Sequence, residues 1–190
     1  MRIGVSSAGI ALVKTSRWGG ERAAVVAEHR FAHGAGAQQV ADGLQALLGD
    51  GSWARWPATV VVSDDLARLW QVTPPPGAAR MADLEAAAAL RFQQLYGEPA
   101  AGWHIAAAWD PSRAFTAAAL PRALSDALTQ AANAHRVALV EIVPQFIAGW
   151  NRWRHLLAAD GWYGLVHDGV LTLGVPDGAS LGAVRAARVP

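Results

Sequence analysis

The chain has 190 residues, 53% of them apolar, and its 16 basic and 15 acidic side chains leave a net charge of +1. This length and composition predict a packed globular chain of one domain or two small ones, and they exclude a disordered chain. The near-neutral total gives no electrostatic footprint for nucleic acid or for an anionic membrane. Without cysteine there is no disulfide framework and no thiolate metal site, which fits a reducing compartment.

The N-terminal segment fits a strand better than a signal peptide, because it has only about ten apolar or small residues and no cleavage-site pattern. No run reaches the ~18 to 20 apolar residues that a membrane span needs. We therefore expect a soluble, cytoplasmic protein that does not itself span a membrane.

Alternating apolar residues predict an N-terminal meander of strands at residues 2–6, 9–15 and 23–31. A predicted helix at 38–48 leads to a β-branched strand at 59–62, whose composition is typical of a strand covered on both faces. A second short strand then meets the three prolines Pro74, Pro75 and Pro76, which can continue neither strand nor helix.

The prolines are followed by a predicted amphipathic helix of about four turns, which ends at Gly97. Its apolar positions recur at helical spacing: Met81, Leu84, Ala88, Phe92 and Leu95. The remaining predicted elements are strands at 103–109 and 114–119, a helix at 121–135, a buried strand at 137–143, a helix at 144–157, and strands at 162–167, at 170–175 and from Leu181 onward.

This order of elements, with the wording at four places, resembles the first half of the actin-like ATPase fold in its FtsA and PilM branch. The four places are MRIGVSSAGIALVK at the N-terminus, ATVVVSDDL at 58–66, VTPPPGAARMADLEAAAALRFQQLYGEP at 72–99 and RVALVEIVPQFIAGWNRW at 136–153. They match that branch's glycine-rich first hairpin, its fourth strand, its proline-marked helix and its returning strand and helix. The chain is also similar to the cytoplasmic domain of GspL, the type II secretion counterpart.

The resemblance implies an α/β protein with an actin-like, ribonuclease H-like core and an inserted small α/β subdomain, the second domain being only partly present. The implied core comprises residues 1–72 and 136–190, of which 160–190 begin the second half. The implied inserted subdomain comprises residues 73–135, including the predicted helix at 121–135. The two core segments are then expected to share one mixed sheet.

Actin-like ATPases place an Asp two residues before a Gly in the first loop and a second Asp-x-Gly in the first hairpin of the second domain, where the carboxylates hold magnesium. Here the first loop reads GVSSAG, without an acid, and the second region has only Asp168, in a tight turn. Ser6, Ser7 and Gly9 remain as a phosphate-loop remnant whose amides bind phosphate weakly at best. The sequence therefore predicts no magnesium ligation, no cofactor and no ATP hydrolysis.

Other residues that suggest chemistry have simpler interpretations. Asp64 and Asp65 point to opposite faces of a strand, so a turn or strand-end role is favoured over a pair of catalytic carboxylates. Glu141 is expected at the end of its strand with hydrogen-bond partners. The six histidines lack the spacing of a zinc site, and Ser6 and Ser7 lack a G-x-S-x-G context.

Nine tryptophans are the least ordinary feature of the composition. Trp150 and Trp153 lie on a predicted helix, where core packing is favoured over binding. A solvent-facing tryptophan beside arginine is typical of a protein-binding hot spot, and two places fit this pattern. They are Trp18 with Arg17 and Arg22, and Trp70 with Arg68.

The favoured function follows from the resemblance: a non-catalytic scaffold at the inner face of the bacterial inner membrane, in a type IV pilus or type II secretion assembly platform. In the resembling pilus proteins a cytoplasmic peptide of a membrane-anchored partner binds a groove beside the inserted subdomain. The candidate partner-binding residues here are Arg68, Trp70, Arg91, Phe92 and Tyr96. The alternative for Trp70 and Phe92 is a place in the core.

Two other classes of function stay open. The first is an active nucleotide-binding ATPase or small-molecule kinase of the actin-like fold, which predicts thermal stabilisation by Mg-ATP. The second is an unrelated α/β enzyme, which predicts convergent polar groups with shifted pKa values in one cleft.

Overall fold

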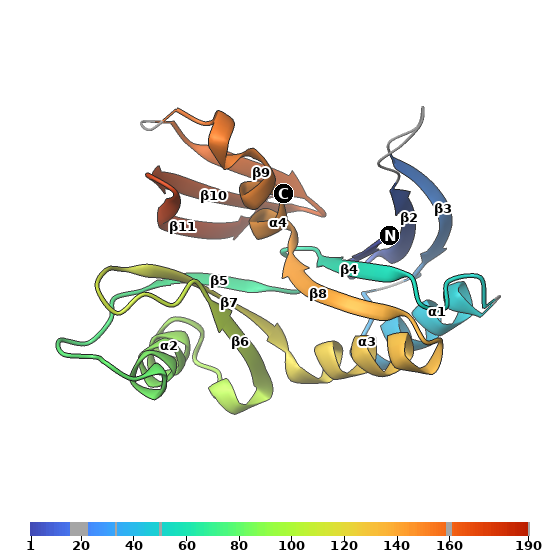
Figure 1. Ribbon diagram of the computed structural model, residues 1–190, viewed down its shortest axis with the longest axis horizontal. Helices are drawn as coiled ribbons and strands as arrows, with labels where there is room; N and C mark the ends of the chain where they lie inside the picture. The colour runs from blue at the N-terminus through green and yellow to red at the C-terminus, as the bar shows by residue number, and fades with distance from the viewer. Residues whose placement is uncertain (16–22, 33, 50, 159–160, 190) are drawn as a thin grey trace. The chain divides into compact units, whose positions relative to one another are not determined.

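The computed structural model describes residues 1–15, 23–32, 34–49, 51–158 and 161–189 (Figure 1). The chain divides into two compact units, each made of two segments. The first unit comprises Met1–Leu66 and Arg122–Ala148, and the second unit comprises Ala67–Pro121 and Gly149–Pro190.

The first unit is built on a five-stranded mixed sheet with strand order β3-β2-β1-β4-β8. Its strands are β1 (Arg2–Val5), β2 (Gly9–Thr15), β3 (Ala23–Arg30), β4 (Pro57–Val62) and β8 (Ala138–Pro144). The first three form the predicted antiparallel meander, and β4 and β8 extend it in parallel. The pairing of β1 with β2 confirms the first hairpin, on which the actin-like prediction depends.

Two helices pack together on the sheet of the first unit. α1 (Ala37–Leu48) lies against β2 and β3, while α3 (Arg122–Ala134) lies against α1 and β8. The fully buried side chains of this core include Ile3, Leu12 and Val60 from the strands and Leu44 and Leu128 from the helices. Because each such side chain contributes roughly 1.5 to 3 kcal/mol on burial, the apolar periodicity of the strands and helices accounts for this layer.

Three expectations for this part of the chain differ from the structure. The helix predicted at 121–135 packs in the first unit, not in the inserted subdomain, because Leu124 and Leu128 face the neighbouring helix layer. The strand predicted as buried is β8, which ends the strand order, so Val140 is 69% exposed. Glu141 is exposed as well and pairs in register with Thr59, within the strand and not at its end.

The second unit contains two antiparallel three-stranded sheets, ordered β5-β7-β6 and β11-β10-β9. Their strands are β5 (Arg68–Val72), β6 (Trp103–Ala107), β7 (Phe115–Pro121), β9 (Tyr163–His167), β10 (Val170–Asp177) and β11 (Ser180–Arg188). β11 lies against β5 and β7, and the Gln71 side-chain amide donates a hydrogen bond to the Leu181 carbonyl. The two sheets therefore belong to one packed body.

Helix α2 (Met81–Tyr96) covers the sheet of β5, β6 and β7. The buried core between them comprises Trp70, Val72, Leu84, Ala88, Phe92, Phe115, Ala117 and Ala119. The helix ends where the sequence predicts, at Gly97, whose φ of 70° is the left-handed conformation that glycine adopts without strain. Short 3-10 helices η1 (Ala100–Gly102) and η2 (Arg154–Leu156) complete the elements, with η2 continuing from α4 (Gln145–Trp153).

The strand pairing departs from the expected domain boundaries at two points. β5, expected in the core, pairs with β7 instead. Residues 163–188, expected to join the N-terminal sheet, form a sheet of their own. The physical reason is the same for both, because alternation of apolar side chains identifies a strand without identifying the strand that it pairs with.

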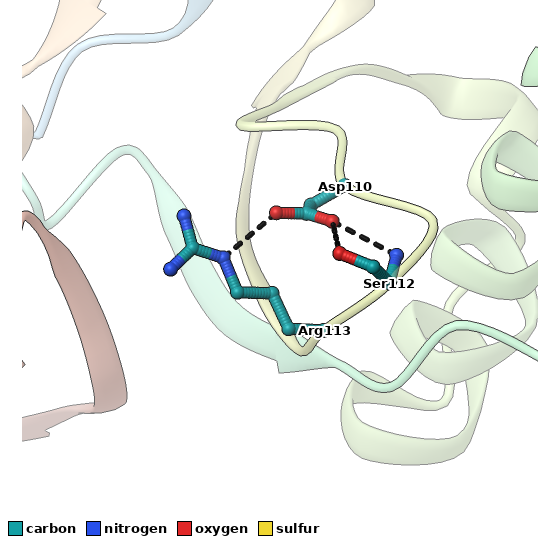
Figure 2. A network of polar contacts seen from close by, with 3 residues as sticks. All are labelled: Asp110, Ser112 and Arg113. Carbon is teal, nitrogen blue, oxygen red and sulfur yellow. Dashed lines mark hydrogen bonds and ion pairs between the residues drawn. The ribbon is translucent and has the colours of Figure 1, made fainter.

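The turn between β6 and β7 is closed by three polar residues (Figure 2). The Asp110 carboxylate accepts hydrogen bonds from the Ser112 hydroxyl at 2.6 Å, the Ser112 amide at 2.8 Å and the Arg113 Nε at 2.8 Å. These bonds, first of all that of the Ser112 side chain, hold the pKa of Asp110 well below its ordinary value. The Asp-Pro-Ser sequence thus makes the turn that joins these strands, as predicted.

Candidate functional site

The second unit has a groove of about 900 Å³ between α2 and the proline loop that precedes it. One wall is the outer face of α2, with Ala86, Ala87, Leu90, Arg91 and Gln94. The opposite wall is the loop from Pro75 to Ala78. The groove follows from the sequence, because consecutive prolines end β5 and Gly77, at φ 78°, turns the chain back towards the helix.

The edge strand β5 forms the base of the groove. Gln71, Val72 and the following Thr73 all line it. Gln71 and Val72 end β5 and Thr73 follows it, so the groove passes the C-terminal end of this strand. β5 is the first strand in its sheet order, and an edge strand carries the main-chain N–H and C=O groups that an added strand can pair with.

The two charged residues that line the groove, Asp83 and Arg91, differ in how far a neighbouring charge compensates their own. Asp83 accepts a hydrogen bond from the Arg80 amide and lies 3.2 Å from the Arg80 guanidinium, so its charge is compensated at the start of α2. Arg91 is exposed, and its one contact among the described residues is a weak hydrogen bond to Gln94 at 3.4 Å. Beside it, Leu90 is 59% exposed. The groove therefore offers a cation and apolar surface together.

The structure brings one of the five predicted partner-binding residues, Arg91, to the groove. Trp70 and Phe92 are 2% and 0% exposed, and their rings pack 5.2 Å apart in the core. The alternative of a core role holds for both, because a side chain without exposed surface cannot touch a docked partner. Sequence reasoning could not separate them from Arg91, since all three share one segment of the chain.

Tyr96 and Arg68 lie at the end of the same core. The Tyr96 hydroxyl donates a hydrogen bond to the Leu69 carbonyl at 3.0 Å, and burial raises the pKa of this tyrosine above its ordinary value. The Arg68 guanidinium lies 5.6 Å from the Tyr96 ring centroid and 5.3 Å from that of Trp103. Both side chains therefore hold β5 to α2 and do not line the groove.

Sequence reasoning missed the groove-lining residues of the proline loop and, apart from Arg91, those on the outer face of α2. Leu90 could have been recognised from the sequence as a residue exposed for contact. The buried stripe of α2 is Leu84, Ala88 and Phe92, and Leu90 is a large apolar residue placed off that stripe. An apolar side chain off the buried face is a candidate for contact with another molecule.

The loop between β1 and β2, the predicted phosphate-loop remnant, uses its amides internally. The Ser6 amide donates to the Gly9 carbonyl at 2.9 Å, the Ala8 amide to the Ser6 hydroxyl at 3.2 Å, and the Ser7 amide to the Asp65 carboxylate at 3.3 Å. A carboxylate thus lies where an anionic ligand would have to bind Ser7. Gly9 has a packing role, because an added Cβ would lie 2.6 Å from the His29 carbonyl oxygen.

The two neighbouring acids Asp64 and Asp65 both have strand-end roles, as the sequence favoured. Asp64 is buried, and its carboxylate accepts a hydrogen bond at 3.2 Å from the Phe146 amide in the first turn of α4. Asp168 lies in the tight turn between β9 and β10, at φ 47° beside Gly169 at φ 69°. Its carboxylate lies 3.0 Å from the His167 Nδ1.

The ranges described above hold neither a metal-binding cluster nor a membrane-spanning helix. Across those ranges, no cluster of three or more His, Asp or Glu side chains is arranged to hold a metal ion. None of the helices in the same ranges has the length and apolar character to cross a membrane. The hot-spot candidate Trp18, with Arg17 and Arg22, lies outside the described residues.

The strand order and comparisons with solved structures together define an actin-like ATPase fold, as predicted. One similar structure is the cytoplasmic domain of EpsL, an inner membrane component of the type II secretion system of Vibrio cholerae. It matches 98% of this chain at 14% identity and a TM-score of 0.65, over 70% of its own length. No family model and no curated protein sequence matches the chain.

Two more solved structures share the fold. The PilM–PilN type IV pilus biogenesis complex matches 98% of the chain at 15% identity and a TM-score of 0.65, over 60% of the matched chain. A Bacteroides thetaiotaomicron protein with an actin-like ATPase fold and unknown function matches 98% at 7% identity and a TM-score of 0.65, over 68% of its length. This chain therefore spans about 60 to 70% of the length of these structures.

Proposed function

We propose that the protein is a non-catalytic scaffold in the assembly platform of a type II secretion or type IV pilus system. In this proposal it works at the cytoplasmic face of the inner membrane and binds a membrane-anchored partner. Its fold, shared with the EpsL cytoplasmic domain and with the PilM–PilN complex, supports the proposal. The hydrogen bond from the Ser7 amide to Asp65 is the observation that favours a scaffold over an ATPase.

The argument against catalysis rests on the polar groups around the first hairpin. A phosphate that bound the Ser7 amide would have to displace a carboxylate, and two like charges so close would repel each other. The loop contributes no acid of its own to hold magnesium. The neighbouring Asp64 is engaged at the start of α4. The polar groups of these residues are engaged in stabilising the fold, which supports a function without ATP hydrolysis.

The argument for a partner rests on the groove of the second unit. An extended peptide can pair its main chain with the edge of β5 and place apolar side chains against Ala86, Ala87 and Leu90. A carboxylate on that peptide would pair with Arg91. The proposed partner segment is therefore extended, apolar on one side and acidic at one position.

The nucleotide part is tested by isothermal titration with Mg-ATP. We expect no binding tighter than about millimolar, which corresponds to roughly −4 kcal/mol. Thermal unfolding gives a second readout, because a ligand at about 100 times its Kd stabilises the native state by roughly 2.7 kcal/mol. Micromolar binding would favour the alternative, an active actin-like ATPase or kinase.

The partner part is tested with the cytoplasmic segment of the membrane protein encoded beside this one. The double variant Leu90→Ala/Arg91→Ala removes the apolar and cationic contacts of the groove, and we expect its affinity to fall by about tenfold or more. Glu85→Ala/Leu95→Ala is the matched control, since both residues are exposed on α2 but lie outside the groove. Equal affinity of both double variants and the wild type would exclude the groove.

A further inference from the structure

The second unit also carries an exposed segment at the end of α4 and in η2, residues 151–156 (NRWRHL). All six residues are exposed, including Trp153 at 46% and Leu156 at 66%. Just before the segment, Trp150 is buried with its ring 5.9 Å from that of Tyr163. The chain thus changes from a buried residue of α4 to a segment in which all six residues are exposed.

The exposed segment combines cations with large apolar side chains. The Arg152 guanidinium lies 5.0 Å from the Trp153 ring centroid. Arg154 donates a hydrogen bond at 3.0 Å to the Ala179 carbonyl, which ties the segment to the turn between β10 and β11. His155 adds an imidazole. From residue 149 to residue 166 the sequence has one carboxylate, that of Asp160, and the acid of the adjoining turn is Asp177.

We propose that residues 151–156 contact the surface of a bilayer that contains anionic phospholipids. Tryptophan favours the headgroup region, where its ring is buried and its N–H stays hydrated, and Leu156 can insert beside it. Arg152 and Arg154 would then meet the lipid phosphates through charge-assisted hydrogen bonds. The near-neutral charge of the whole chain does not oppose this, because the attraction is local and falls off within about 10 Å.

A membrane is favoured over a protein as the occupant because of the small size of the segment. A stable protein interface buries about 800 Å² on each partner and involves roughly 20 to 30 residues a side. Six exposed residues fall far short of that, whereas a fluid bilayer surface needs no complementary shape. Binding through so few groups is weak and reversible, so the contact orients a protein that another interaction retains.

The test is co-sedimentation of the full chain with phosphatidylcholine vesicles that contain or lack phosphatidylglycerol. We expect binding to the anionic vesicles alone, decreasing as salt is added. Arg152→Ala/Arg154→Ala should lower the association constant roughly 25-fold, since each arginine near an anionic surface contributes about fivefold. Trp153→Ser/Leu156→Ser should also lose binding. All four side chains are exposed, so the variants should keep the melting temperature of the wild type.

The control is Arg185→Ala/Arg188→Ala, which removes two exposed arginines of β11 and leaves residues 151–156 intact. It should bind anionic vesicles like the wild type. Equal binding to both kinds of vesicle, an equal loss in the control pair, or no binding at low salt would each overturn the proposal. None of these outcomes bears on the groove, because the proposal does not depend on the scaffold function.

Discussion

The two units use their polar residues in different ways. In the first unit, Asp64 and Asp65 each accept a main-chain hydrogen bond, and the amides of the loop at Ser6 to Ala8 all have partners within the unit. In the second unit, Arg91 and Leu90 lie exposed in a groove. The acids and amides of the first unit thus make contacts that stabilise its fold, whereas the groove of the second unit presents a cation and an apolar side chain to solvent.

The largest expected effect is on the free energy of unfolding, and it distinguishes a core residue of the second unit from a residue of its groove. Phe92→Ala removes a fully buried ring from the cluster that holds α2 to its sheet, and it should lower the free energy of unfolding by about 3 to 5 kcal/mol. Leu90→Ala, two residues earlier on the exposed face, should change it by less than about 0.5 kcal/mol. Urea denaturation measures both. A similar loss in the two variants would mean that the groove is part of the core.

The next effect tests whether glycine in the first loop serves packing. Gly9→Ala places a Cβ against the His29 carbonyl, and main-chain atoms cannot rotate away, so a loss of about 1 to 3 kcal/mol in unfolding free energy is expected. Gly34→Ala, where no heavy atom lies within 4 Å of the new Cβ, should be near neutral. Thermal melts of the two variants provide the measurement. If Gly9→Ala melts at the wild-type temperature, the glycine has no packing role, and close approach of a ligand becomes the better explanation for it.

A smaller effect is expected at Asp64. Asp64→Ala removes the acceptor for the Phe146 amide and should cost about 1 to 2 kcal/mol of stability. Asp42→Ala is its control in the same unit, because the Asp42 carboxylate accepts an exposed side-chain hydrogen bond from Gln38. The control should cost less than about 0.5 kcal/mol. If chemical denaturation shows no difference between the variants, Asp64 is free for another role.

The smallest effect concerns the turn at Asp110 and depends on pH. Its pKa is lowered in the folded protein, so its contribution to stability is present above the ordinary value of 3.8 and is lost as the pH falls through the folded-state value. Asp110→Asn should therefore melt slightly below the wild type near neutral pH, with the gap narrowing below pH 3.8. A gap that stays constant from neutral to strongly acidic pH would contradict the role of the charge.

Local chemistry in the sequence predicted much of the fold. The β1–β2 hairpin, the end of α2 at Gly97 and the Asp110 turn each depend on residues close together in the chain, so pattern and propensity suffice. The environments of α3 and β8 depend on which distant element covers them. Leu124 and Leu128 show that α3 has an apolar face, but the α1 layer that receives this face is remote in sequence.

The candidate site was predictable only in part, because it too depends on packing between elements that are distant in the sequence. Arg91 was a predicted contact residue, and the structure places it at the groove. The assignment of Trp70 and Phe92 to a binding surface failed, because the composition of a hot spot and that of a core are alike. Only the burial of each ring distinguishes the two, and burial depends on strand pairing that the sequence does not reveal.

The chain passes between the units at Leu66, at Pro121 and at Ala148, and this order has a consequence for biosynthesis. A ribosome releases the polypeptide from the N-terminus at roughly 5 to 20 residues per second, and domains tend to fold as they emerge. The first unit stays incomplete until β8 has emerged, because that strand and α3 belong to it. Until then the apolar partners of α3 on α1 are uncovered, and the nascent chain is an expected client of chaperones during that interval.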